Sequence, residues 1–343
     1  MTVLVTGGAG YIGSHVVHEL VDAGLAVVVL DDLSTGFAWA VPVGARLVVG
    51  DVADTMLLRE LHKEHGITAI VHMAGSVVVP DSVRDPLGYY LNNTVKSRAL
   101  MAFAVEAGVK HFIFSSTAAV YGTPARVPVD ESAELKPLSP YGTSKLMTEL
   151  MLADAAKAHP LDFVILRYFN VAGADPSGRT GQSTRGATHL IKVACEAALG
   201  KRDGIEVYGT DYPTRDGTCI RDFIHVTDLA RAHVSALRYL QAGGASDTFN
   251  CGYSRGFSVL EVLAAVEHAS GRRLNVKMGP RRPGDSVEVV ADSARLRRAL
   301  AWNPFHQDLA TIVRDALRWE RTLDTGEEHR LHLGDAATPT AAE

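Results

Sequence analysis

Short apolar runs without regular polar alternation recur through the first half of the chain. They are rich in valine, isoleucine, leucine and phenylalanine, which is typical of strands buried on both faces of a parallel sheet. Six runs are predicted as strands: Val3–Thr6, Val27–Leu30, Leu47–Val49, Ala69–His72, Phe112–Ser115 and Phe163–Arg167.

Longer segments with a helical spacing of apolar residues lie between these runs. They cover Ile12–Ala23, Thr55–His65, Asn92–Ala107 and Tyr141–His159. Strands that alternate with helices build βαβ units, so the pattern predicts an α/β fold with a doubly wound, parallel Rossmann sheet.

The turn after the first predicted strand is rich in glycine. Residues 6–13 read TGGAGYIG and satisfy the GxGxxG spacing of dinucleotide-binding turns. The place of this turn between a strand and a helix favours that function, because glycines let the backbone approach a pyrophosphate at the helix N-terminus. In the alternative, the turn is tight for structural reasons only.

Acidic residues follow the second and third predicted strands. Asp31 and Asp32 end the second strand, where a carboxylate can accept hydrogen bonds from both ribose hydroxyls and would repel a 2′-phosphate. This position favours NAD over NADP. Asp51 and Val52, after the third strand, are a weaker signal for a contact with the adenine.

A tyrosine and a lysine lie four positions apart near the start of the last predicted helix. Pro140 disfavours helix at Ser139 and suits a first helical turn, so Tyr141 and Lys145 share one helical face. A tyrosine with a pKa of about 10 is a poor base unless a cation favours its phenolate. Lys145 is placed to supply that cation, which must outweigh desolvation; a bound nicotinamide cation would help. In the alternative, Tyr141 caps a core and Lys145 is solvated.

Hydroxyl side chains end the fifth predicted strand at Ser115, Ser116 and Thr117. Ligands of such folds bind at the carboxyl edge of the sheet, so we expect Ser115 near the cofactor and Thr117 near a substrate hydroxyl. In the alternative, Thr117 only satisfies a local backbone group.

Composition excludes several classes of partner. The chain has 343 residues, a formal net charge of -5 and 47% hydrophobic residues, which disfavours nucleic acid and anionic membrane surfaces. It opens directly into a predicted strand and contains no run long enough to span a membrane, so we expect a cytoplasmic protein. The cysteines at 195, 219 and 251 and the fourteen histidines lack metal-ligand or disulfide spacing, and no metal is predicted.

Eight segments, in order, resemble the extended short-chain dehydrogenases/reductases, and most of all the UDP-glucose/UDP-galactose 4-epimerases. They read GGAGYIGSH, HMAGSVVVPDSV, YYLNNT, FIFSSTAAVYG, SPYGTSK, LRYFNVAGADPSG, GTDYPTRDGTCIRDFIHV and RRPGD. The resemblance runs from the first predicted strand to about residue 320. It implies a Rossmann fold with bound NAD and epimerisation of a UDP-hexose at C4.

The resemblance also implies site residues. The proton-relaying tyrosine falls on Tyr141, its lysine on Lys145 and its serine/threonine on Thr117. Cofactor contacts are expected from these residues and from Gly7, Gly10, Tyr11, Ile12, Gly13, Asp31, Asp32, Asp51, Val52, Met73, Ala74, Gly75, Asn92, Ser115 and Phe169. Met73 replaces a common phenylalanine of the family, a change expected to affect packing only.

UDP-sugar contacts are implied for a second set of residues. They are Thr117, Asn170, His189, Leu190, Glu206, Tyr208, Arg221, Arg282, Asp285 and Val289. The two arginines suit a diphosphate, or in the alternative form surface ion pairs. Two departures predict rearranged diphosphate contacts: the family's lysine after the HxAG turn is absent, and His189 replaces an asparagine.

The implied reaction is redox-neutral. Tyr141 takes the proton of the sugar 4-hydroxyl while hydride leaves C4 for NAD. The 4-keto sugar then rotates to present its other face before hydride returns. Two enzymatic alternatives remain: a 4,6-dehydratase, disfavoured by Ala118 and Ala119 where that class carries Asp-Glu, and an epimerase of UDP-pentoses or UDP-uronates. A non-catalytic NAD-sensing protein is disfavoured because Tyr141 and Lys145 are both present.

Position 289 sets the expected size of the sugar. In the resembling family, a tyrosine there restricts the pocket to glucose and galactose, and a smaller residue leaves room for an N-acetyl group. Val289 therefore predicts activity on N-acetylated sugars. In the alternative, Val289 only packs within a strand.

Domain organisation follows from the same resemblance. Residues 1–170, with 222–250 returning, are expected to form the NAD-binding domain; 171–325 mainly form a smaller α/β domain for the UDP-sugar; and 326–343 form a disordered tail. A homodimer is predicted from apolar positions on two helices, Leu146, Leu150 and Met151 on one and Leu100 and Phe103 on the other. In the alternative, both stripes face their own sheet.

Overall fold

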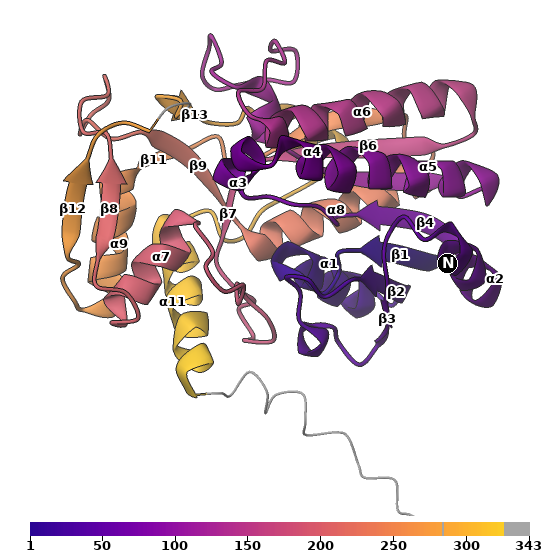
Figure 1. The fold of residues 1–343 in the computed structure, drawn as a ribbon, viewed down its shortest axis with the longest axis horizontal. Helices are drawn as coiled ribbons and strands as arrows, with labels where there is room; N and C mark the ends of the chain where they lie inside the picture. The colour runs from indigo at the N-terminus through magenta and orange to yellow at the C-terminus, as the bar shows by residue number, and fades with distance from the viewer. Residues whose placement is uncertain (283–284, 326–343) are drawn as a thin grey trace, which may run out of the picture.

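A seven-stranded parallel sheet forms the larger part of the molecule. The computed structural model describes residues 1–282 and 285–325. The strand order is β10-β6-β5-β4-β1-β2-β3, which is the doubly wound order expected of a Rossmann sheet (Figure 1). The strands are β1 (Thr2–Thr6), β2 (Ala26–Asp31), β3 (Ala45–Val49), β4 (Ile67–His72), β5 (His111–Thr117), β6 (Asp162–Tyr168) and β10 (Asp247–Cys251).

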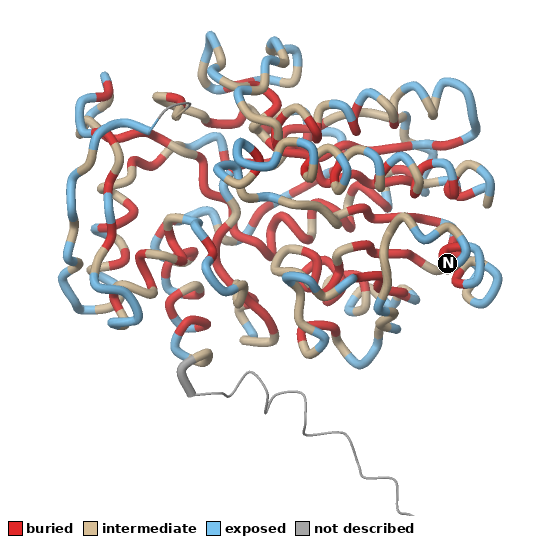
Figure 2. The backbone as a smooth tube through the Cα atoms, in the orientation of Figure 1, coloured by how far each residue is buried: buried red, intermediate tan, exposed pale blue. Residues whose placement is uncertain are grey.

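Helices cover both faces of this sheet. One layer holds α1 (Tyr11–Asp22) and α8 (Val226–Gln241); the other holds α2 (Thr55–His65), α5 (Lys96–Glu106) and α6 (Pro140–Ala158). Successive side chains of a strand point to opposite faces, so Val3 and Val5 pack with the first layer and Leu4 with the second. Figure 2 shows the buried positions concentrated in the strands between the two layers.

The predicted elements of this sheet are present with small shifts of their ends. The segment expected to start a helix at Asn92 differs most, because helical backbone begins earlier, at α4 (Pro86–Tyr89), and passes through a π-helical turn, η2 (Tyr90–Val95), into α5. A short helix, α3 (Val79–Arg84), precedes α4.

Strand β10 is not among the six predicted strands. Its sequence carries one large apolar residue, and its Asn250 is fully buried. The Asn250 amide accepts a hydrogen bond from Tyr121 Oη (2.7 Å) and donates one to the Val129 carbonyl (2.8 Å). These partners are more than a hundred residues away in sequence, so local hydropathy gives no sign that this asparagine belongs to a core strand.

The remaining elements form a smaller lobe. Its main sheet has the order β11-β9-β13, with β7 also paired to β9, and β8 pairs with β12. The elements are β7 (Asn170–Ala172), α7 (Leu190–Ala198), β8 (Ile205–Tyr208), β9 (Ile220–His225), β11 (Gly256–Ser258), α9 (Val259–Ser270), β12 (Val276–Gly279), β13 (Glu288–Val289), α10 (Ala294–Ala299) and α11 (Leu309–Thr325).

The chain crosses between the two lobes more than once. Strand β9 lies in the smaller sheet, yet α8 follows it at once and packs against α1, and β10 completes the large sheet. Segment 222–250, predicted to return to the NAD-binding domain, is thus divided at Val226. The proposed tail, 326–343, lies outside the described residues.

The three cysteines are buried and free. Within residues 1–282 and 285–325, no helix is long and apolar enough to cross a membrane. The same part of the chain contains no group of three or more histidine, cysteine, aspartate or glutamate side chains placed to hold a metal ion.

A buried carboxylate, Asp228, connects α8 to the segment before α11. It accepts hydrogen bonds from Tyr253 Oη (2.6 Å) and from the N–H groups of Phe305 (3.0 Å) and His306 (2.8 Å). Burial alone would raise the pKa of Asp228, but these hydrogen bonds and that of the His306 ring lower it from 3.8 to about 2. The folded state therefore favours the ionised form.

We expect Asp228→Asn to lower the free energy of unfolding by about 2 kcal/mol at pH 7. Because the folded-state pKa lies below the unfolded value, this stabilisation is present above pH 4 and is lost as the pH falls through 2. Urea unfolding measures the difference in the free energy of unfolding between variant and wild type. This difference should be smaller at pH 3.5 than at pH 7. Asp154→Asn, at an exposed pair with Lys157, is the control. A gap that is equal at both pH values would contradict the prediction.

Candidate active site

The glycine-rich turn between β1 and α1 has the shape of a dinucleotide cradle. Gly7 has φ +71°, and a Cβ there would lie 2.6 Å from Ala74 N; a Cβ on Gly13 would lie 2.0 Å from Gly7 O. These two glycines are needed for packing. Gly10 differs, because a Cβ there would meet only Gly7 O at 3.4 Å, and it caps α1 without a side-chain acceptor. The N–H groups of this helix start are left for an anion, so the turn fits a pyrophosphate.

Asp31 lies directly beside this turn. Its carboxylate accepts the N–H groups of Ala9 and Leu33, each at 2.9 Å, and burial raises its pKa. A carboxylate has about four lone-pair sites, so two remain for ribose hydroxyls. Asp32 instead is exposed and accepts a hydrogen bond from Ser34 N (2.9 Å). Of the two acids, Asp31 is therefore the one that contacts the glycine-rich turn.

The turn after β4 approaches the start of α6. A Cβ on Gly75 would lie 2.9 Å from Asn93 Oδ1 and 3.6 Å from Lys145 Nζ. Asn92 donates to Ser76 Oγ (2.8 Å), whereas Asn93 is buried, accepts Ser76 N (2.7 Å) and donates to Ser144 Oγ (3.0 Å). Sequence reasoning named Asn92 and missed Asn93, the residue that joins this turn to α6.

Other predicted cofactor residues lie around the same sheet edge. Asp51 forms an ion pair with Lys96 at 2.6 Å, which sequence reasoning did not foresee. Val52 packs at the margin of the second core, Met73 packs on the first core, and Phe169 is buried after β6. Ile12 also packs on the first core, and Ala74 N lies 3.5 Å from Thr6 Oγ1.

Tyr141, Thr117 and Lys145 are brought together at the carboxyl ends of the strands. Helix α6 begins at Pro140, as the sequence predicts, and Ser139 caps it by accepting Gly142 N (3.2 Å). Tyr141 is hydrogen-bonded to Thr117, whose Oγ1 also accepts Ala119 N (3.1 Å). The contact with Ala119 N is the local backbone role named as the alternative, and the contact of Thr117 with a substrate hydroxyl stays a prediction. Lys145 Nζ donates to Ser115 O (3.0 Å) and lies 5.0 Å above the Phe114 ring.

Burial controls the titration of this group. It raises the pKa of Tyr141, and the Thr117 hydrogen bond only partly opposes that rise. It lowers the pKa of Lys145 to about 8, although the Glu149 carboxylate acts to raise it. Among the protein's own groups, burial therefore has the largest effect on the pKa of Tyr141, and the stabilisation of its phenolate by Lys145 stays a prediction. A bound cation beside the phenol would act in the opposite direction.

A buried ion pair extends the same helical face. Glu149 follows Lys145 by four residues and pairs with Arg167 of β6 at 2.6 Å, and both side chains are less than a tenth exposed. Ser116 donates to the same carboxylate, and Arg167 Nη1 donates to Tyr121 Oη (3.0 Å). Sequence reasoning missed Glu149, although its spacing from Lys145 was visible.

The predicted diphosphate residues form a cluster in the smaller lobe. Arg282 Nε donates to Asp285 Oδ2 (3.0 Å), and Arg221 Nη2 lies 3.9 Å from Asp285 Oδ1. The Arg282 guanidinium lies 4.8 Å above the Tyr208 ring, and Tyr208 Oη donates to Glu206 Oε2 (3.0 Å). The two arginines are therefore ion-paired, as the alternative expected, and adjacent, as a diphosphate site requires.

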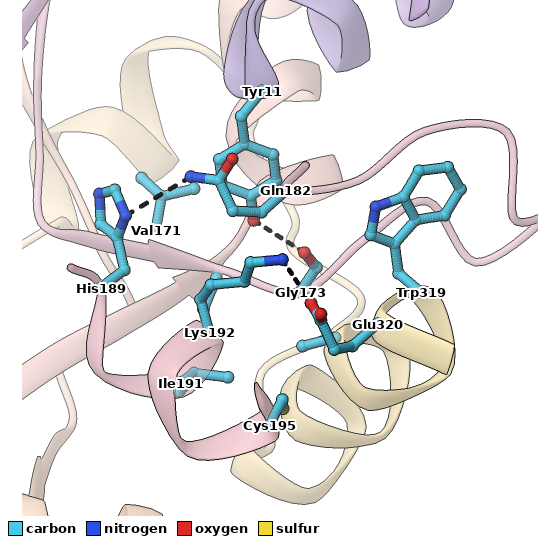
Figure 3. Close-up of a pocket in the computed structure, with 12 residues that line it drawn as sticks. Tyr11, Val171, Gly173, Gln182, His189, Ile191, Lys192, Cys195, Trp319 and Glu320 are labelled. Atoms are coloured by element: carbon cyan, nitrogen blue, oxygen red, sulfur yellow. Dashed lines mark hydrogen bonds and ion pairs between the residues drawn. The ribbon is translucent and has the colours of Figure 1, made fainter. Parts of the chain in front are cut away.

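Three predicted substrate residues lie at other places. His189 and Leu190 start α7, beside a small pocket lined by Tyr11, Gly173 and Lys192 (Figure 3). His189 Nδ1 lies 3.5 Å from Gln182 Nε2, and no hydrogen bond or ion pair found among the described residues joins it to the arginine cluster. Asn170 is exposed at the start of β7. Tyr11 donates its hydroxyl to Gly173 O (2.8 Å), which links the turn to the smaller lobe.

The glycine-rich turn, Asp31 and the Tyr141–Lys145 pair occupy one edge of a Rossmann sheet. Residues 3–252 match the model of the NAD dependent epimerase/dehydratase family. The chain belongs to this family. The fold and the use of NAD that the sequence predicted are confirmed by this membership and by the sheet order.

Similar proteins within the epimerase/dehydratase family are named as UDP-glucose 4-epimerases. That of Azospirillum brasilense is 56% identical over 98% of this chain and 95% of its own length. The Bifidobacterium longum enzyme, solved with NAD+ and UDP, is 36% identical over 95% of this chain and 100% of its own, with a TM-score of 0.89. The UDP-Glc/GlcNAc 4-epimerase of Campylobacter jejuni is 44% identical over 94% and 99%, with a TM-score of 0.83. The resemblance seen in the sequence is confirmed.

Proposed function

We propose that this protein is an NAD-dependent isomerase that inverts C4 of a UDP-hexose, as a UDP-glucose 4-epimerase does. The observation that carries the proposal is the contact of Tyr141 with Thr117, beside a buried Lys145, at the sheet edge that also holds the nucleotide turn. The names of the similar proteins support the same reaction.

The chain's own residues handle the proton. Tyr141 accepts it from the 4-hydroxyl of the sugar and returns it after the sugar has turned, and Thr117 exchanges its hydrogen bond to Tyr141 for one to that hydroxyl. Lys145 supplies positive charge when Tyr141 is a phenolate. The glycine-rich turn and Asp31 would hold NAD+, which would supply the acceptor for the C4 hydride and the donor for its return.

Inversion requires a firm grip on the nucleotide and a loose grip on the hexose. Two arginines and the Tyr208 ring in the smaller lobe offer charge and a flat surface for UDP. The diphosphate would compete with Asp285 for both guanidinium groups. Firm UDP binding leaves the 4-keto sugar free to present its second face before hydride returns.

Dehydration is the nearest alternative reaction, and the structure gives it little support. Ala118 and Ala119 start a short 3-10 helix, η3 (Ala118–Tyr121), directly after Thr117. Neither side chain can act as the acid or base that loss of water from C5 and C6 needs. The products should therefore keep the mass of their substrates.

Incubation of the purified protein with a panel of UDP-sugars tests this proposal. We expect conversion between UDP-glucose and UDP-galactose without change in mass. Chromatography with mass spectrometry would reveal a dehydratase by a loss of about 18 Da. Turnover of UDP-pentose or UDP-uronate alone would replace the hexose as the substrate, and no turnover of any UDP-sugar would contradict the proposal.

Self-association is a further part of the proposal. The sequence-based argument was partly wrong, because Leu100 and Phe103 are buried in the molecule's own core. Of the other three positions, Leu146 and Met151 are partly buried and Leu150 is exposed. An exposed apolar surface remains on η2 and on α6, which contact each other; it comprises Leu91, Val95, Met147 and Leu150. We propose that a second copy covers this surface in a homodimer.

Light scattering at low micromolar concentration should give twice the chain mass of 36.7 kDa. Leu150→Glu should shift the protein to the monomer, because a carboxylate would be buried unpaired in the interface. Val43→Glu places the same charge on an exposed valine elsewhere and should leave the dimer intact. A wild-type mass of one chain would rule the dimer out. The cytoplasm remains the predicted location, which three buried free thiols suit.

A further inference from the structure

The segment between β2 and β3 lies against the glycine-rich turn. Phe37 N donates to Ala9 O at 2.9 Å, and a Cβ on Gly36 would lie 2.9 Å from the Ala9 carbonyl carbon. The same turn residue, Ala9, donates its N–H to Asp31 at the start of this segment. Residues 32–41 therefore lie beside the groups that fit the ribose and pyrophosphate of a dinucleotide.

An aromatic stack fastens this segment to the smaller lobe. The Phe37 and Trp39 ring centres are 5.3 Å apart, and the Trp39 and Trp319 ring centres are 6.0 Å apart with planes inclined by 31°. Phe37 caps the short helix η1 (Ala38–Ala40), Trp39 lies within it, and Trp319 belongs to α11. The stack connects the cofactor edge of the large sheet with α11.

Trp319 is the fixed side of this stack. It is only 3% exposed, and its indole N–H donates to Ser183 Oγ at 3.1 Å. A Cβ on Gly181 would lie 2.3 Å from the Trp319 ring, so the backbone closes tightly on one face of the indole. Trp39, the ring that belongs to residues 32–41, is half-buried and therefore more accessible to solvent than Trp319.

We propose that the stack of Phe37, Trp39 and Trp319, here called the aromatic clasp, keeps residues 32–41 closed over bound NAD and slows its release. This inference rests on the proposed function. The hydride taken from C4 must return to the same sugar, so a reduced cofactor that leaves early would end the cycle with a ketose in the site. Residues of the clasp act through the segment they hold and do not touch the reacting atoms.

Release of NADH from the full-length protein tests the clasp. The protein is loaded with NADH, mixed with excess NAD+, and followed by the loss of bound NADH fluorescence. We expect Trp39→Ala to release NADH about fivefold faster, since an aromatic pair of this kind changes a rate by several-fold when lost. Trp39→Phe should stay within about twofold of wild type, because a ring of similar geometry is kept.

Matched variants separate the clasp from a general loss of packing. Phe305→Ala removes an exposed ring outside the clasp and should leave the release rate unchanged. The thermal midpoint of each variant is measured with NAD removed; Phe37→Ala replaces Trp39→Ala if the latter does not fold.

The results that overturn the clasp differ from those that overturn the proposed function. Equal NADH release from wild type, Trp39→Ala and Phe37→Ala would refute the clasp and leave the epimerase proposal standing. Faster release from Phe305→Ala as well would also refute it, since the effect would not depend on the stack. A wild-type protein that binds no NAD(H) would refute the proposed function itself.

Discussion

Tyr141→Phe is expected to lower kcat by about 10²–10⁴-fold while NAD stays bound, since removal of a general base typically has this effect. The change deletes one hydroxyl whose partner is Thr117 and leaves the buried ring in place. Helix α6 should therefore keep its position. Steady-state turnover of UDP-galactose and the cofactor content of the purified variant are the measurements.

Tyr239→Phe provides a matched control for this variant. Tyr239 lies on α8, edge-on to Phe249, and no hydrogen bond or ring contact found among the described residues joins it to Tyr141. Its kcat should equal that of wild type. A Tyr141→Phe variant with wild-type kcat would remove Tyr141 from the mechanism, and one that has lost NAD would show that the phenol mainly supports cofactor binding.

Val289→Tyr is expected to abolish turnover of UDP-N-acetylglucosamine and to preserve turnover of UDP-galactose. Strand β13 runs parallel to β9 with Val289 opposite Arg221, one of the arginines proposed to bind the diphosphate. The sugar is attached to the diphosphate, so if Arg221 binds the diphosphate, the hexose would lie near position 289. The valine side chain is much smaller than the tyrosine ring that would replace it.

Space alone does not bind an N-acetyl group. Its amide must find a partner, because an unpaired buried polar group costs about 1–3 kcal/mol, which would erase the gain from the methyl. The 44% identical protein of Campylobacter jejuni is named a UDP-Glc/GlcNAc 4-epimerase, so its name includes the N-acetylated sugar. We propose that wild type converts UDP-N-acetylglucosamine to UDP-N-acetylgalactosamine.

Competing assays with both substrates on wild type, Val289→Tyr and Val289→Ala decide the matter. Val289→Ala keeps the position small and should retain both activities. If wild type turns over UDP-galactose and leaves the N-acetylated sugar unchanged, the size argument fails for this protein. If Val289→Tyr retains both activities, the ring must turn away from the sugar and position 289 does not set specificity.

Features encoded within a few residues were predictable from the sequence. The glycine-rich turn, the start of α6 at Pro140 and the buried parallel strands each follow from local spacing and composition. Features that depend on distant partners were not. Asn93 looks like an ordinary polar helix residue until Ser76 and Ser144 are placed beside it.

The pKa values of Tyr141 and Lys145 also depend on parts of the chain that are distant in sequence. The four-residue spacing places Lys145 on the correct face, but the pKa of each group depends on how much water the fold removes. Burial is a property of the assembled sheet edge, to which β5, the turn after β4 and α6 all contribute. The sequence therefore indicated that Tyr141 and Lys145 share a helical face, but it could not indicate in which direction the fold shifts their pKa values.

The return of the chain from the smaller lobe to the large sheet has a consequence for biosynthesis. Strand β6 pairs with β10, whose last residue is Cys251, and α8 covers α1 only after β9 has been made. While the ribosome adds residues 171–246, β6 is an open sheet edge with Val164, Ile165 and Leu166 in it. An uncovered apolar edge can pair with other chains. Completion of the large sheet must therefore wait until β10 has been made, and a nascent chain stalled in that interval would expose this edge to chaperones.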